Sequence, residues 1–470
     1  MTSPRRHFTG WLLIAFLFAV VALPQANALP AFARKYGLRC SACHEAWPML
    51  NYFGQKFKDN GYQLMNDRDS PVWQNPSYWP VTFRITPYWH RESTDKVAVD
   101  SVTGDGTSAP VERQLTGHGF DLSGLDFHTG GTLEKNFSFY VLPSSDPTGA
   151  FHFETVMARL DNLFGSSWFN LKLGKFELDN LLSEKRILTL TSISGVYETY
   201  HFVPPGDANI FGQMGDNQLG IEYMGHSVDD RSRVSAALLS SNDGNVNLTT
   251  GNAYSGFFTA SQAFDAGKLG VERVGMYAMV GAAPVTYLTS GGVPVPASGT
   301  NNKDFYRVGF VGQIYLGNLD FQVVTQHGYD NAYFGQGYGN ATNPSNGSTC
   351  IPGCGLNYIP GVSPLLPSTA RAPVWNGYLV ETHYTYSPQL IFIQRSEWER
   401  VSQQASTTNP GNLGNMDMYT FGMRWYPIMN PRAGFAWHNE YSWLRTQGLS
   451  PVTGTALTSS SLFSGFDFDF

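Results

Sequence analysis

The stretch Val81-Thr-Phe-Arg-Ile-Thr-Pro-Tyr-Trp-His90 alternates between apolar and polar side chains. The apolar positions are Val81, Phe83, Ile85 and Trp89, and the polar positions are Thr82, Arg84, Thr86 and His90. Successive side chains of a β-strand point to opposite faces, so this stretch predicts a strand with one apolar and one polar face. In a membrane β-barrel the first face contacts lipid and the second lines a polar lumen.

The same alternation recurs along the sequence, for example over residues 137–141, 169–173, 218–223, 319–323 and 419–425. We count about sixteen such segments, and bacterial single-chain barrels have an even number of strands. The last residues agree, because Phe466, Phe468 and Phe470 alternate up to the end, which resembles the terminal assembly signal of outer-membrane barrels. We therefore predict an all-β fold: a transmembrane outer-membrane barrel of antiparallel strands over residues 80–470.

The connections between these segments alternate in length. Tight turns are predicted at 134–136, 165–167, 226–230, 264–268, 317–318, 387–388 and 428–432, and long connections at 93–117, 179–215, 281–303 and 331–372. Short periplasmic turns and long outer loops are the expected asymmetry. In the longest loop, Cys350 and Cys354 predict a local disulfide, with a metal site as the minor alternative. The apolar segment 181–203 predicts a constriction loop folded into the lumen, or else an extra hairpin.

Composition excludes other classes. Charged residues make up 14% of the sequence, below the ~25% of soluble domains, while aromatic residues make up 14% and glycines number 49. After the N-terminal region no apolar run reaches 18 residues, which excludes a helical membrane protein. The net charge of −7 argues against a nucleic-acid partner, which requires a basic face.

Residues 1–28 have the pattern of a cleaved signal peptide. Arg5 and Arg6 precede an apolar run over 11–23, and Ala26-Asn-Ala28 supplies the small residues of a cleavage site. The run is shorter than the ~20 residues that span a bilayer, which disfavours an uncleaved anchor. We therefore expect export to an oxidising compartment, with the mature protein starting at Leu29.

Residues 29–79 predict a small helical module around Cys40-Ser-Ala-Cys43-His44. In an exported protein, the pattern C-x-x-C-H is the attachment signature of one covalent c-type haem. Two thiols form thioethers to the porphyrin, and the following histidine, His44, ligates the iron. Half of a zinc site or a redox dithiol are the alternatives, but no second ligand pair with suitable spacing follows and no βαβ pattern surrounds the motif.

One amphipathic helix is expected after the haem motif. Pro48 can open it, Leu50, Phe53 and Phe57 share one face, and Gly61 suits its C-terminal cap. A module of about 50 residues rarely buries enough surface to stand alone, so we expect it to plug the periplasmic side of the barrel.

The sixth haem ligand has several candidates. Met65 is the first, because the backbone can turn back towards the haem after Gly61, and a methionine would raise the haem potential. Met49, five residues after His44 on a continuing helix, is placed on the proximal side or in the packing. His90 is the main rival, and His128 faces the lumen by the same alternation.

One resemblance to a known family covers about a tenth of the sequence. The matching residues are Pro30 to Arg34, Gly37, Cys40 to His44, Phe53-Gly54, Phe57-Lys58 and Gly61-Tyr62. In order and spacing they resemble the N-terminus of the fused outer-membrane cytochrome c-porins of iron-oxidising bacteria. The resemblance implies oxidation of extracellular Fe(II) and electron transfer inward to a periplasmic carrier. We expect that carrier to be a small cytochrome or copper protein.

The combination of haem and barrel suggests an electron conduit, because the outer membrane insulates. Lumen-facing charges fit either a plug held by polar contacts or a wetted porin wall; they are Arg84, Asp126, Arg159, Asp161, Lys172, Glu222, Arg307, Arg395, Glu397, Glu399, Arg424 and Glu440. Three other functions stay open: an outward conduit, a haem-plugged porin or transporter whose haem is structural or a redox sensor, and a periplasmic peroxidase. Whether the protein is an enzyme, as an Fe(II) oxidase of the cytochrome c reductase type, also stays open.

Overall fold

The computed structural model describes residues 31–46, 49–65, 69–74, 80–99, 111–145, 149–179, 218–240, 254–283, 287–288, 294–295, 303–329, 374–402, 415–429, 434–450 and 452–469. The predicted signal peptide, the segment 181–203, the cysteines Cys350 and Cys354, and Phe470 lie outside these ranges. In the described part no helix is long and apolar enough to cross a membrane.

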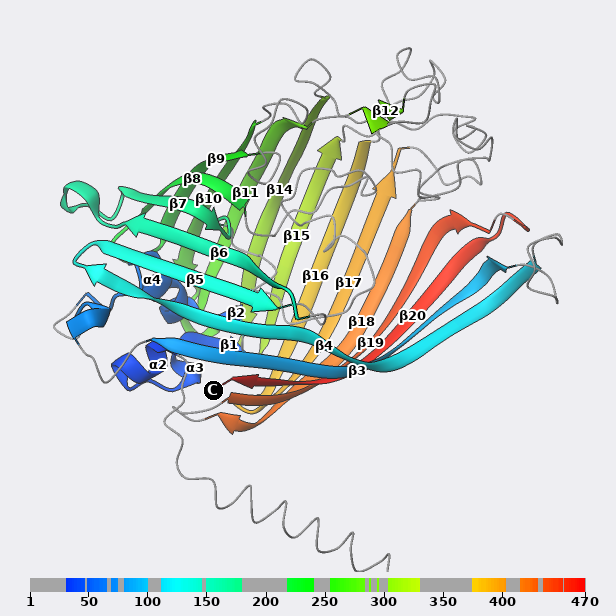
Figure 1. Cartoon of the computed structure of the whole chain (residues 1–470), viewed down its shortest axis with the longest axis horizontal. Coiled ribbons are helices and arrows are strands. Elements are labelled where there is room, and N and C mark those ends of the chain that lie inside the picture. The colour runs from blue at the N-terminus through cyan, green and yellow to red at the C-terminus, as the bar shows by residue number, and fades with distance from the viewer. Residues whose placement is uncertain are drawn as a thin grey trace, which may run out of the picture.

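Sixteen antiparallel strands form a closed barrel, as predicted (Figure 1). Each strand pairs with its neighbours in sequence, and β20 pairs with β3 to close the sheet. The strands are β3 Val81–Val99, β4 Val111–Glu134, β5 Phe137–Ser145, β6 Phe151–Leu160, β7 Asn170–Phe176, β8 Gln218–His226, β9 Ser232–Ser240, β10 Tyr254–Asp265, β11 Val271–Ala283, β14 Lys303–Leu316, β15 Leu319–Tyr329, β16 Val374–Ser387, β17 Leu390–Val401, β18 Met416–Met429, β19 Gly434–Leu449 and β20 Ala456–Asp469. Between β11 and β14, β12 (Tyr287–Leu288) and β13 (Pro294–Val295) form a separate hairpin.

The predicted short turns are confirmed wherever the structure describes them. Glu134 and Phe137 end and begin neighbouring strands, and Leu316 and Leu319 do the same. The predicted long connection at 93–117 is wrong in its bounds, because β3 runs on to Val99 and β4 begins at Val111. The polar residues of this stretch pair across the two strands, which sequence periodicity alone did not indicate.

The two faces of the barrel differ as the alternation predicts. Large apolar side chains are exposed on the outside of many strands, including Phe258, Met276, Phe310, Phe392, Phe421 and Tyr441. The charged residues predicted to face the lumen are buried or partly buried; Arg307, Arg395, Glu399 and Arg424 are at most 1% exposed. In the last strand Phe466 and Phe468 are exposed, whereas Asp467 and Asp469 are buried. An exposed apolar band around a closed sheet is what a lipid environment requires.

The N-terminal residues form short elements at the end of the barrel where β3 begins and β20 ends (Figure 1). They are α2 Ala31–Tyr36, α3 Cys40–Cys43, β1 His44–Ala46, β2 Met49–Leu50, α4 Tyr52–Asp59 and the 3₁₀ turn η1 Val72–Gln74. We call this group the N-terminal module.

Helix α4 differs in two respects from the predicted helix. It begins at Tyr52, not at Pro48, because the Asn51 side chain accepts a hydrogen bond from the Gly54 amide and caps it. Met49 therefore lies in a two-residue strand, not on a continuing helix. Phe53 is 42% exposed, so it does not share the buried face of Phe57. The predicted cap at Gly61 is confirmed by its positive φ of 71°.

Candidate functional site: the C-x-x-C-H turn and its cavity

The C-x-x-C-H motif forms one turn followed by an extended residue. Helix α3 contains only Cys40 to Cys43, and His44 leaves it with extended angles (φ −119°, ψ 139°). Neither cysteine is in a disulfide. Burial, and secondarily Cys40, raise the pKa of the Cys43 thiol to about 11, the opposite of the lowered pKa of a redox-active dithiol.

A cavity of about 590 Å³ opens beside this turn. Cys40, Cys43 and His44 line it, as do Leu50 and Gly54 from the module. Its other walls come from the inner faces of β3 to β8 and from β20. The volume is within the range of about 300–1,000 Å³ that is usual for small-molecule and cofactor sites. The donor set and the space beside it therefore fit a porphyrin attached at Cys40 and Cys43.

Gly54 lets α4 approach the motif closely. A Cβ atom at this position would collide with the carbonyl oxygen of Cys43. A larger residue would push α4 away from the turn that carries the cysteines. Gly54 of the Phe53-Gly54 pair thus has a packing reason within the module.

Aromatic rings join the module to the barrel wall. The Phe32 and Tyr62 rings stack with centroids 4.9 Å apart, and Phe57 meets both rings edge-on. The Tyr62 ring lies 6.0 Å from that of Tyr140 on β5. Such ring pairs add about 0.5–1.5 kcal/mol each beyond their buried area.

Arginines of the wall hold the end of α4. Arg159 donates to the carbonyls of Lys58 (2.7 Å) and Asp59 (2.9 Å), which are at the helix C-terminus. Arg233 donates to the Asp59 carboxylate at 2.9 Å and to Asp179 at 2.5 Å. Lys58 also pairs with Glu177 at 2.9 Å. The module is therefore bonded inside the barrel by polar contacts.

Asp230, in the turn between β8 and β9, adjoins these arginines. Arg233 Nε lies 3.6 Å from its carboxylate, and an Arg273 nitrogen lies 3.4 Å away. Burial, with the Asp59 charge nearby, nevertheless raises the pKa of Asp230 to about 8. One proton is thus held in the polar contact between module and wall near neutral pH.

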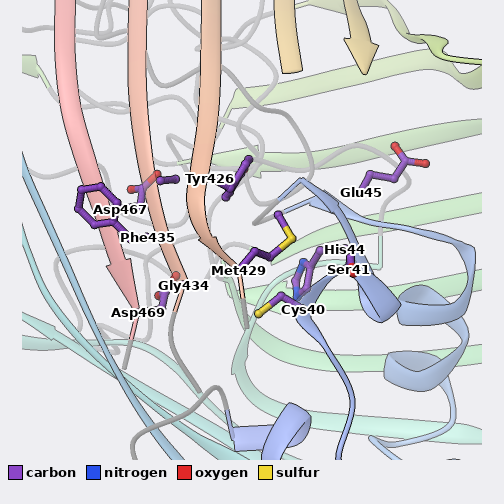
Figure 2. Close-up of a pocket in the computed structure, with 11 residues that line it drawn as sticks. Cys40, Ser41, His44, Glu45, Tyr426, Met429, Gly434, Phe435, Asp467 and Asp469 are labelled. Atoms are coloured by element: carbon purple, nitrogen blue, oxygen red, sulfur yellow. The ribbon is translucent and has the colours of Figure 1, made fainter. Parts of the chain in front are cut away.

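The candidate sixth ligands lie in different places. Met65 is 55% exposed and does not line the cavities that contain Cys40 and His44. Its role as the sixth ligand stays a prediction. His90 and His128 both line the large cavity with Cys40 and His44. The sequence analysis missed Met429, which lies beside Cys40 and His44 in a second, small pocket (Figure 2). The sequence feature that could have pointed to Met429 is its position in the predicted turn 428–432, at the predicted periplasmic end of a strand.

Comparison with known proteins gives likenesses of architecture only. No protein-family model and no curated protein matches the sequence. The anion-selective porin of Comamonas acidovorans is similar in structure with a TM-score of 0.46, 11% identity, and coverage of 83% of this chain and 99% of that one. OmpT of Vibrio cholerae is similar with a TM-score of 0.45 and 9% identity, over 83% of this chain and 99% of that one. The channel DcaP of Acinetobacter baumannii is similar with a TM-score of 0.41 and 10% identity, over 83% of this chain and 97% of that one. The strand pairing establishes the sixteen-stranded barrel by itself.

Proposed function

We propose that this protein is a haem-bearing outer-membrane barrel that carries electrons across the membrane. The observation that carries the proposal is the position of Cys40, Cys43 and His44 on a cavity inside a closed barrel. The apolar outer face supports a membrane location, and the sequence predicts export to the outer membrane.

Different residues of the protein would bind different parts of the haem. Cys40 and Cys43 would hold the porphyrin covalently, and His44 would bind the iron. Arg39 and Arg84 line the same cavity, and guanidinium groups suit the carboxylates of a porphyrin. When bound, the haem supplies a one-electron redox centre.

The module would keep solutes out of the lumen as well as hold the haem. Arg159 and Arg233 fix α4 to the wall, so the module narrows the periplasmic end of the lumen. Electrons would cross the membrane while solutes would not. The resemblance to cytochrome c-porins favours extracellular Fe(II) as donor and a periplasmic carrier as acceptor.

Reconstitution into liposomes tests this proposal. The purified protein is inserted into vesicles that enclose a soluble cytochrome c, and Fe(II) is added outside. We expect the enclosed cytochrome to be reduced while an enclosed dye of low mass is retained. Dye release without reduction would instead favour a porin with a structural haem, and reversed loading of donor and acceptor tests the outward direction.

A further inference from the structure

Two cavities among the described residues adjoin His44, and they differ greatly in volume. The cavity beside Met429 and Phe435 has a volume of about 30 Å³. The other, of about 590 Å³, is the cavity lined by both cysteines. A haem attached at Cys40 and Cys43 would occupy the larger cavity, and a second iron ligand besides His44 would then come from the walls of that cavity.

Strand register shows which wall residues lie level with the motif. Cys40 and Asp469 line both cavities, and Asp469 is paired with Arg84 of β3. Arg84 is paired with Asp126 of β4, and His128 follows two residues later, about 7 Å along the strand. His90 lies six residues beyond Arg84 on β3, which is about 20 Å at ~3.3 Å per residue.

His128 also has the second contact that is usual for a metal-ligating histidine. Its Nδ1 lies 2.6 Å from the Tyr140 hydroxyl. A hydrogen bond to one ring nitrogen orients the other nitrogen towards a metal. Tyr140 is itself fixed from two sides, because the Tyr62 ring stacks on it and its own ring occupies the space that a Cβ at Gly130 would need.

From these positions we propose that His128 is the second axial ligand of the haem iron. The inference rests on the proposed function, because it requires covalent haem at Cys40 and Cys43. His44 and His128 would give two imidazole ligands and a lower potential than histidine with methionine. Tyr140 would be the positioning residue.

The methionines of the same cavity have other roles in the structure. Met157 is buried in the apolar cluster with Phe57 and Tyr62, and Met224 is buried in the wall of β8. His128, by contrast, is half-buried and lies level with the motif. Core packing therefore accounts for both methionines but not for His128.

Magnetic circular dichroism and electron paramagnetic resonance of the oxidised holoprotein test this inference without any activity measurement. The variants are His128→Met, His128→Ala and Tyr140→Phe, with His90→Ala as the matched control on the same cavity. We expect a bis-imidazole spectrum in the wild type and in His90→Ala. His128→Met should give a histidine–methionine charge-transfer band, and His128→Ala should become high-spin and return to low-spin with added imidazole. Tyr140→Phe should keep the low-spin state with shifted g-values.

Three results would overturn the inference. The first is a bis-imidazole spectrum that persists in His128→Ala and disappears in His90→Ala. The second is a histidine–methionine spectrum in the wild type that is lost in Met65→Ala, Met157→Leu or Met429→Leu. The third is a protein without covalent haem, which would overturn the proposed function as well; the first two would leave that function intact.

Discussion

The inner wall of the barrel has two halves that neutralise their charges differently. On β16, β17 and β19 the partners are two residues apart on one strand: His383 with Glu381, Arg395 with Glu397, and His438 with Glu440. On β6 and β9, Arg159 and Arg233 reach into the N-terminal module. We call these halves the self-paired wall and the module-paired wall.

The two walls show two uses of inward-facing charges, which either pair within the wall or bind the N-terminal module. Side chains at i and i+2 share one face of a strand, so these pairs of the self-paired wall form within one strand. His383 also pairs with Asp320 of the neighbouring strand β15, at 2.6 Å. Arg159 also pairs with Asp161 in this way, at 2.8 Å, but its other donors go to the end of α4. Arg159 and Arg233 would thus lose partners if the module left, whereas the pairs Arg395–Glu397 and His438–Glu440 each lie within one strand.

The largest expected effect concerns the haem itself. The double variant Cys40→Ala, Cys43→Ala should abolish the haem-stained band on a denaturing gel, because no thioether can then form, while Cys350→Ala should leave it unchanged. Wild-type colour should resist acid–acetone extraction. Extraction of the colour from the wild type would contradict covalent attachment.

The second largest effect is expected when an arginine of the module-paired wall is replaced. Arg233→Gln leaves Asp59 buried with a lost partner, and breaking a buried ion pair costs about 3–5 kcal/mol. We expect a loosened module, seen as higher ion conductance in a planar bilayer and faster proteolysis near Lys58. The matched variant is Arg395→Gln in the self-paired wall. Equal conductance in both variants would contradict the proposed plug.

A smaller effect is a dependence of stability on pH in the module-paired wall. Because the pKa of Asp230 is raised to about 8 from 3.8, the folded protein keeps a proton that the unfolded protein releases in that interval. Stability should therefore fall as pH rises from about 4 to about 8. The groups that face Asp230 are Arg233, Arg273, His226 and Asp59.

The measurement is the temperature at which the barrel loses its folded mobility on a gel, at pH 5 and pH 8. Asp230→Asn should flatten this dependence, and Asp229→Asn, at the exposed neighbouring position, should keep it. An identical slope in the wild type and in Asp230→Asn would remove Asp230 as its source.

A tag inserted near Asn346 is expected to change the properties of the protein least. The predicted topology places this segment outside the cell and the N-terminal module at the periplasmic end. The tag should be accessible on intact cells without altering haem content or conductance. Accessibility only after the outer membrane is broken would invert the assignment.

Periodicity in the sequence predicted about sixteen strands, the inward or outward direction of their side chains and the short turns. These follow from local rules: a period of two sends Phe466 and Phe468 outward and Asp467 inward whatever lies beyond the strand. The motif at Cys40 to His44 was equally visible, because its chemistry depends on spacing within five residues.

Contacts between residues far apart in sequence set which charges meet the module and which side chains share a cavity with the motif. Alternation gives Arg233 and Arg395 the same inward direction, yet one binds Asp59, far away in sequence, and the other binds Glu397 on its own strand. Likewise His90 and His128 both face inward, and strand register alone separates them along the lumen. Long-range pairing sets these distances, and periodicity carries no information about it.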